Sequence, residues 1–195
     1  MPILIATRNA HKLQEIREML PGVKIIGTDT YPEVPDPVED GETFEANAAI
    51  KALAWAKATG LTAVADDSGL EVDALNGAPG IHSARYAGEH GNTAANNAKL
   101  LRELEGVPAP QRTARFVCAL AVATPDGMVK TLRGVCEGAI LVDAAGANGF
   151  GYDPLFVPAG YTDSFGILPD AVKAGISHRA KAFMAAREQW ADFIR

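Results

Sequence analysis

Cysteine is scarce in this sequence of 195 residues, which contains only Cys118 and Cys136. Two cysteines give neither a disulfide framework nor a zinc cluster, so we expect both to pack as small buried hydrophobic side chains. Long hydrophobic runs are also missing. The N-terminal run, Ile3–Ala6, is far too short for a signal peptide or a membrane span. We therefore expect a soluble cytoplasmic protein without a membrane partner.

Positive charge is in the minority, with 18 lysines and arginines against 24 aspartates and glutamates and a formal net charge of −6. A protein that coats DNA, RNA or an anionic membrane needs a broad basic field, so no nucleic-acid polymer is expected as a partner. A small anionic ligand needs only a few well-placed cations and stays possible. The hydrophobic share of 48% and the length are those of a globular protein with one domain, or with two small lobes around one core. We expect a single domain over residues 1–195.

Strand and helix patterns alternate along the chain. Apolar runs predict buried strands at 3–6, 23–27, 61–65 and 70–75, the last two joined by an acidic turn at 66–69. Helical spacing and end signals predict helices at 13–20, 43–60, 93–104 and from Ser177 onwards. The last of these carries a hydrophobic face of Phe183, Ala186, Trp190 and Phe193. Two β-rich runs, 115–124 and 128–142, flank Pro125-Asp126-Gly127 and predict a hairpin. A mixed α/β protein is therefore expected, and a purely parallel sheet is not.

The segment Thr7–Lys12 lies between a predicted strand and a predicted helix. The start of a helix offers free backbone N–H groups and the positive end of the helix dipole, which favour a phosphate. Thr7 and Asn9 can add hydrogen-bond donors, and Lys12 can add a full charge. The glycine spacing of a Walker A motif is absent, and a capped helix with a solvated lysine would explain the same residues.

Two adjacent carboxylates, Asp66 and Asp67, directly follow an apolar strand. Carboxylates near a core are costly without a partner, and metal binding or general-base chemistry would supply one. Hard oxygen ligands of this kind suit Mg²⁺ or Mn²⁺. The alternative is a tight turn that uses aspartate and glycine for their backbone geometry.

A second acidic pair, Glu39-Asp40, precedes a predicted helix on which Asn47 and Lys51 share one face. An acidic pair beside a helix lysine can hold a metal and a phosphate together. A charged loop followed by a surface lysine is the plainer interpretation.

Two further segments offer groups that suit a flat heterocyclic ligand. In Phe150–Asp153 the phenyl ring can stack on a base, and the aspartate can accept hydrogen bonds from ring N–H groups. Near the last predicted helix, Lys173 and Ser177-His178-Arg179 present donors that suit carbonyl oxygens or anions. An aromatic plug over the core and a capped helix start are the structural alternatives.

Taken together and in order, these segments resemble the inosine triphosphate pyrophosphatase family. The similar stretches cover nearly the whole chain: 7–12 (TRNAHK), 39–52, 65–75 (ADDSGLEVDAL), 77–88, 112–120, 148–154 (NGFGYDP) and 176–182. The resemblance implies an elongated mixed β-sheet flanked by helices, with two lobes and a central active-site cleft. It also implies a homodimer that hydrolyses ITP, dITP and XTP to the monophosphate and pyrophosphate with Mg²⁺.

The resemblance assigns roles to residues at matching positions. Asp67 is implied as metal ligand and general base, and Glu39 as second metal ligand, although Asp40 can compete for that place. Ser68 is implied to contact the substrate. The implied triphosphate-binding residues are Thr7, Arg8, Asn9, Ala10, His11, Lys12 and Lys51. The implied base-binding residues are Phe150, Gly151, Tyr152, Asp153, Lys173, His178 and Arg179.

Selectivity follows from the chemistry of position 6 of the purine. Donors from His178 and Arg179 would match a 6-oxo group and would be left unpaired against the amino group of adenine. One departure from the family pattern is Gly166-Ile167-Leu168, where an acidic Ala-Glu-Leu type segment is usual. A nucleotide sensor without activity and a phosphatase that releases orthophosphate are the alternative functions, and the intact Asp66-Asp67 pair argues against a sensor.

Overall fold

The computed structural model describes residues 2–194, which form two compact units. Both are built from separate stretches of the chain. Unit 1 comprises residues 1–67, 118–134 and 179–195, and unit 2 comprises residues 68–117 and 135–178. Each unit contains a cluster of buried hydrophobic residues.

The strands join in one mixed sheet of order β2-β1-β3-β4-β5-β6. Their bounds are β1 (Ile3–Ile5), β2 (Ile25–Gly27), β3 (Ala63–Val72), β4 (Thr113–Ala123), β5 (Val129–Ile140) and β6 (Phe156–Pro158). Strand β1 runs parallel to β2 and β3, whereas β5 and β6 are antiparallel. The predicted hairpin is confirmed, since the Thr124 N–H donates to the Met128 carbonyl at 3.0 Å between β4 and β5.

The helices are α1 (Ala10–Met19), α2 (Phe44–Thr59), α3 (Thr93–Glu103), α4 (Asp170–Ile176) and α5 (His178–Gln189). Short 3-10 helices lie at Thr28–Thr30, Asp73–Leu75, Gly80–Arg85, Ala109–Gln111 and Asp153–Leu155. Helix α2 matches its prediction closely. Thr43 caps its first turn by accepting from the Ala46 N–H, and Gly60 ends it in the left-handed conformation at φ 69°.

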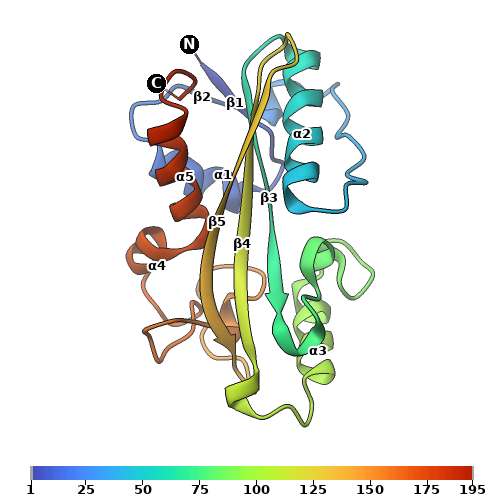
Figure 1. The fold of residues 1–195 in the computed structure, drawn as a ribbon, viewed down its shortest axis with the longest axis vertical. Coiled ribbons are helices and arrows are strands. Elements are labelled where there is room, and N and C mark those ends of the chain that lie inside the picture. The colour runs from blue at the N-terminus through green and yellow to red at the C-terminus, as the bar shows by residue number, and fades with distance from the viewer. Residues whose placement is uncertain (1, 195) are drawn as a thin grey trace. The chain divides into compact units, whose positions relative to one another are not determined.

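In unit 1 the two faces of the sheet bury different side chains. Larger residues of alternate strand positions pack with α1 and α5 in one cluster, among them Ile5, Val64 and Leu120. The positions between them are buried alanines such as Ala65 and Ala119, which point to the opposite face. Figure 1 shows α1 and α5 on one side of this part of the sheet and α2 on the other. Phe183, Ala186 and Trp190 confirm the predicted buried face of α5.

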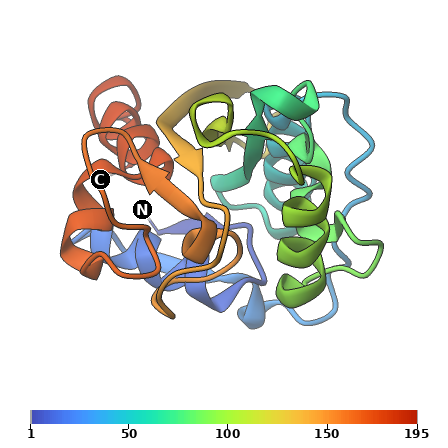
Figure 2. The same ribbon diagram turned by 90° about the horizontal axis from the view of Figure 1, so that it is seen from below.

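In unit 2 the helices also lie on both sides of the strands. Figure 2 shows α3 on one side and the segment that carries α4 on the other. The buried Arg112 donates to the carbonyls of Leu104, Val107 and Leu141 at 2.8–2.9 Å, which fixes the end of α3 against the sheet. The sequence analysis did not predict β6 or α4, since three strand residues and a seven-residue helix give weak patterns.

One prediction of local structure is wrong. Residues 66–69 form no turn, because β3 runs without a break from Ala63 to Val72. The Asp-Asp-Ser-Gly composition favours a turn locally, but β3 continues through it beside its neighbour β4, so the sheet overrides that preference.

Both cysteines are buried, as predicted. Among residues 2–194, no helix is long and apolar enough to cross a membrane.

Candidate active site

The continuity of β3 decides how the two central carboxylates are placed. Successive side chains of a strand point to opposite faces. Asp66 has the same parity as Val64 and faces the cluster with α1 and α5, where Cys118 Sγ lies 3.5 Å from its Oδ2. Asp67 therefore points to the opposite face, on the side of α2. Adjacent residues of identical chemistry thus occupy different environments.

Asp66 is buried and fully engaged by cations. Lys12 Nζ lies 2.6 Å from Oδ1, and the Arg179 guanidinium contacts Oδ2 at 3.0 Å. Burial by itself raises the pKa of a carboxyl group, but the charges of Lys12 and Arg179 outweigh it and hold the pKa of Asp66 well below its usual range. Asp66 is therefore a permanent anion that anchors two positive side chains.

Arg179 is held by two carboxylates of the protein itself. It belongs to unit 1, its side chain is only 1% exposed, and it binds Glu15 at 2.6 Å in addition to Asp66. Burial lowers the pKa of a guanidinium, yet Asp66 and Glu15 raise that of Arg179 above its ordinary value. Its charge is thus balanced by two carboxylates inside unit 1, and its role as a donor to the purine stays a prediction.

Asp67 has the opposite character. Its Oδ2 is buried and has no hydrogen-bond partner among residues 2–194. Burial is the main cause that raises the pKa of Asp67 to about 6. Lys12 and Lys51 act in the opposite direction, while Glu39 and Asp66 add to the increase. A carboxylate with an unused oxygen and a pKa near neutrality suits a general base or a metal ligand.

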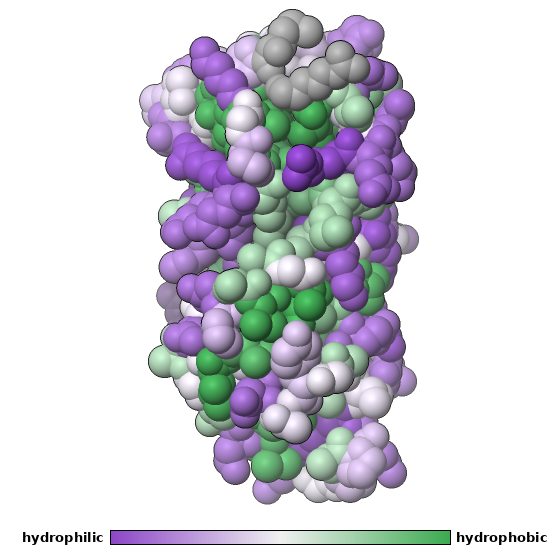
Figure 3. All heavy atoms as spheres, turned by 90° about the vertical axis from the view of Figure 1, so that its left-hand side faces the viewer, coloured by the Kyte–Doolittle hydropathy of each residue, from purple (hydrophilic) through white to green (hydrophobic). Residues whose placement is uncertain are grey.

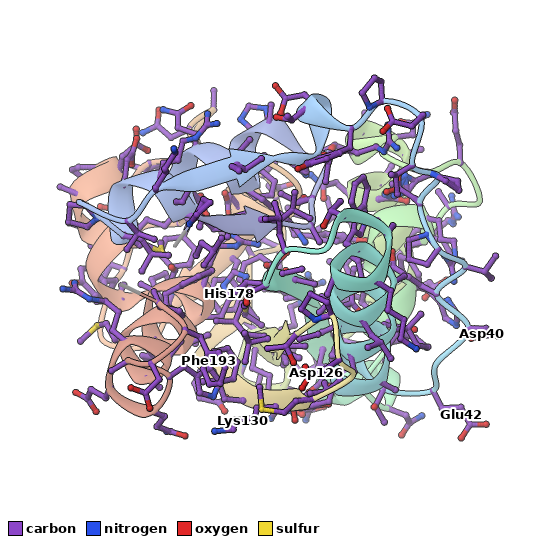
Figure 4. The ribbon with its side chains drawn as sticks, turned by 90° about the horizontal axis from the view of Figure 1, so that it is seen from above. Asp40, Glu42, Asp126, Lys130, His178 and Phe193 are labelled. Carbon is purple, nitrogen blue, oxygen red and sulfur yellow. The ribbon has the colours of Figure 1, made fainter. Side chains whose placement is uncertain are left out.

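Glu39 is the member of the second acidic pair that lies close to this site. Its carboxylate binds Lys51 Nζ at 2.9 Å, and the same ammonium group donates to the Asp66 carbonyl at 3.3 Å. The loop is fixed to α2 because the Gly41 N–H donates to Asn47 Oδ1 at 2.8 Å. Asp40, in contrast, is exposed, and Figure 4 shows it on the outer edge of its loop together with Glu42.

The carboxylates of this region fit a divalent metal of the magnesium type. No group of three or more His, Cys, Asp and Glu side chains converges anywhere in the described chain. Mg²⁺ does not need such a cage, because it is commonly held by one or two carboxylates together with substrate phosphates and water. The buried, unpartnered oxygen of Asp67 and the nearby Glu39 provide that minimal set.

The turn before α1 is organised by its own side chains. Asn9 caps the helix by accepting from the His11 and Lys12 N–H groups at 3.0 and 3.2 Å, and Thr7 Oγ1 accepts from the Asn9 N–H. Arg8 turns away to bind Asp36 at 2.6 Å. His11 is exposed. Lys12, in the first turn of α1, is the residue of segment 7–12 that contacts Asp66 directly.

In unit 2, Asp153 and Lys173 form a buried ion pair with Nζ and Oδ2 2.7 Å apart. The same Oδ2 accepts from the Phe150 N–H at 2.8 Å, so the carboxylate fixes the loop that carries the phenyl ring. Lys173 Nζ lies 4.6 Å from the centre of that ring. The predicted base-binding residues Phe150, Asp153 and Lys173 therefore form one connected group.

Tyr152 is buried and donates to the Ser83 carbonyl at 2.8 Å, which makes it a support of the loop. The Gly151 carbonyl accepts from Asn97 on α3 at 3.1 Å. His178 is buried as well, and its ring stacks on Phe116 at 4.8 Å. Ser68 is the first residue of unit 2 and lies half-buried on β3, directly after Asp67.

The sequence analysis missed four residues that hold these groups: Glu15, Asn97, Phe116 and Cys118. Only Glu15 had a detectable signal, because it lies three residues after Lys12 on the same helix face. The other three belong to patterns that indicate only a helix or a buried strand.

The chain is similar to known proteins in sequence and in structure. The sequence model of the Ham1 family matches residues 3–189. The chain is similar to the dITP/XTP pyrophosphatase of Desulforamulus reducens, with 50% identity over 190 residues, covering 96% of this chain and 94% of that protein. The corresponding protein of Geobacillus kaustophilus is 47% identical over 194 residues, 98% of this chain and 95% of the relative. The structure of the Staphylococcus aureus Ham1 protein matches with a TM-score of 0.89 and 40% identity, over 98% of this chain and 99% of that one.

Arg179→Met is expected to lower the free energy of unfolding by about 3–5 kcal/mol, because it leaves the buried carboxylate of Asp66 without one of its two cations. Urea unfolding at neutral pH measures the change. Arg187→Met, at an exposed position of the same helix, is the matched control and should change stability by less than about 0.5 kcal/mol. A surface-exposed Arg179 that served only the ligand would give the same small change, and that result would contradict the placement.

Asp67→Asn is expected to stabilise the metal-free protein above pH 6. The pKa of Asp67 is raised to about 6 from 3.8, so the folded protein holds this proton more tightly than the unfolded chain does. Stability is therefore lost as the pH rises from about 4 to about 6, and asparagine does not titrate. The substitution should add about 2 kcal/mol to the free energy of unfolding near pH 7.5 and little near pH 4.

Urea unfolding in EDTA at the two pH values measures this difference. Asp40→Asn, at the exposed neighbour of Glu39, is the control and should change the free energy of unfolding by less than about 0.5 kcal/mol. Equal effects of Asp67→Asn at both pH values would show that the carboxylate is not strained in the folded protein.

Proposed function

The chain belongs to the Ham1 family, and from this premise we infer that it is a hydrolase of non-canonical purine nucleoside triphosphates. ITP, dITP and XTP are its substrates, and the products are the nucleoside monophosphate and pyrophosphate. The observation that carries the inference is the different environment of two adjacent carboxylates. Asp66 is neutralised by Lys12 and Arg179, whereas Asp67 has a buried oxygen without a hydrogen-bond partner in the described part of the chain.

Asp67 acts as the general base toward the attacking water. Its pKa of about 6 leaves it deprotonated at neutral pH and still basic enough to accept a proton. Asp66 supports this role because it is permanently charged and cannot take the proton in its place. The water oxygen forms a bond to the α-phosphorus while its proton passes to Asp67. The bond from the α-phosphorus to the oxygen that bridges it to the β-phosphorus breaks, and pyrophosphate leaves with that oxygen.

Asp67 and Glu39 would hold a divalent metal ion, which we propose to be Mg²⁺. When bound, such an ion supplies positive charge that stabilises the negative charge developing on phosphate oxygens. Lys51 binds Glu39 and the Asp66 backbone, so it keeps the second carboxylate beside the first.

The triphosphate is assigned to the turn before α1 and to two lysines. Residues Thr7–Lys12 surround the positive end of the helix dipole, and Lys12 and Lys51 are only 17% and 15% exposed in their side chains. Partly buried ammonium groups attract phosphate more strongly than fully solvated ones. Arg8 contributes by holding the loop through Asp36.

The purine is assigned to unit 2. Phe150 offers a half-exposed ring for stacking, and Lys173 beneath it is fixed by Asp153. Gly151 and Tyr152 shape the loop, Ser68 contacts the substrate next to the base catalyst, and His178 donates to the 6-oxo group. An adenine, with an amino group at this position, would leave that donor unpaired.

We also propose a homodimer with a cytoplasmic location, where the triphosphate pool to be cleared is found. Figure 3 shows apolar side chains gathered on one part of a face whose borders are hydrophilic. Continuous apolar surface of this kind favours association between protein molecules.

Incubation with ITP, XTP, dITP, GTP and ATP in the presence of Mg²⁺ tests the function. We expect turnover of the first three, with equal amounts of monophosphate and pyrophosphate. Asp67→Asn should reduce kcat by roughly 100-fold or more, in line with the loss of a general base. Release of orthophosphate would indicate a phosphatase, and binding without turnover would indicate a sensor.

Glu39→Gln is expected to weaken Mg²⁺ binding by about tenfold or more, the scale typical for groups that support a metal. Asp40→Asn, at the adjacent exposed carboxylate, should leave it unchanged. The rise of Tm on titration with Mg²⁺ gives a measurement that does not depend on catalysis. A stronger effect at Asp40 than at Glu39 would transfer the metal-binding role to Asp40.

A further inference from the structure

The imidazole of His178 lies flat against the ring of Phe116. The ring centres are 4.8 Å apart and the planes differ by only 16°. Both side chains are buried, with exposures of 6% for His178 and 7% for Phe116. The two residues belong to unit 2 and come from different elements, α5 and β4.

Phe116 is itself held in place by other aromatic rings. Its centre lies 4.5 Å from that of Phe156 and 6.4 Å from that of Phe165, and the latter two are 5.6 Å apart. Its backbone is part of a long central strand of the sheet. Phe116 therefore presents a rigid flat surface to His178.

The orientation of the imidazole plane matters for a hydrogen bond. Rotation about the bond between Cβ and the ring of histidine is soft, so the backbone alone does not select a plane. The N–H bonds lie in that plane, and hydrogen bonds weaken steeply when the angle at the hydrogen falls below about 120°. A parallel phenyl ring selects one plane and so fixes the direction in which the imidazole donates.

We propose that Phe116 is a specificity-determining positioning residue that acts through His178. The proposal rests on the proposed function, in which His178 donates to the 6-oxo group of the purine. Phe116 fixes the imidazole plane so that this donor meets an oxygen at position 6 and stays unpaired against an amino group. Loss of the flat ring lets the imidazole turn. This change weakens the binding of ITP, which accepts the hydrogen bond, more than the binding of ATP, which does not.

The test compares kcat/KM for ITP and for ATP in Phe116→Leu, which keeps an apolar side chain and removes the flat face. We expect the ITP/ATP ratio to fall about tenfold, mainly through a higher KM for ITP. Phe116→Tyr keeps the ring and should restore most of the ratio. Because both substrates are measured on the same sample, partial unfolding lowers both values and leaves the ratio unchanged.

Phe165→Leu is the matched control, because Phe165 belongs to the same aromatic cluster and its ring centre lies 6.4 Å from that of Phe116. It should change the ratio by less than about twofold, whatever it does to Tm. An equal fall of the ratio in Phe165→Leu would show that general packing, and not the plane of His178, sets the preference.

A double-mutant cycle with His178→Ala separates the two proposals. His178→Ala should lower the ratio, and Phe116→Leu should have no further effect in that background. If His178→Ala lowers the ratio and Phe116→Leu alone does not, the role of Phe116 is refuted while the function of His178 stands. If His178→Ala leaves the ratio unchanged, the proposed donor is wrong and the role of Phe116 falls with it.

Discussion

The uninterrupted course of β3 through two adjacent aspartates is the constraint on which the chemistry depends. A strand sends successive side chains to opposite faces, so Asp66 and Asp67 cannot share an environment. Asp66 lies in the buried cluster and forms ion pairs, whereas Asp67 faces the α2 side and its Oδ2 has no hydrogen-bond partner in the described residues. A turn at this point would have removed the alternation that sends the two carboxylates to opposite faces.

Placing Asp66 in the core makes demands on the rest of unit 1. A buried carboxylate without a cation would be strongly destabilising, so Lys12 and Arg179 must accompany it. The buried Arg179 needs negative charge in addition to that of Asp66, and Glu15 on α1 provides it. The ion pairs thereby connect the turn before α1, the central strand and α5 through one charge-balanced group. The segments that carry the proposed phosphate and metal chemistry are held by this group.

Much of this could be predicted from the sequence, and the exceptions share a cause. Patterns of single segments gave α2 with its caps, the hairpin between β4 and β5 and the buried face of α5. The Asp66-Asp67 pair was found, but its local composition favoured a turn, because sheet pairing is not visible in four residues. The contacts of Arg179 with Glu15 and of His178 with Phe116 join positions far apart in the chain, so the spacing of residues within a segment does not show which of them meet.

Neighbouring residues of one motif therefore need separate explanations. His178 and Arg179 follow each other at the start of α5, yet the first stacks in unit 2 and the second is neutralised in unit 1. The same holds for the two aspartates of β3. In both pairs one residue forms buried ion pairs within unit 1, and to its neighbour we assign a contact with the ligand. The two residues of each pair are neighbours in the sequence. The buried and ion-paired residue therefore fixes the backbone from which the side chain of the other residue projects.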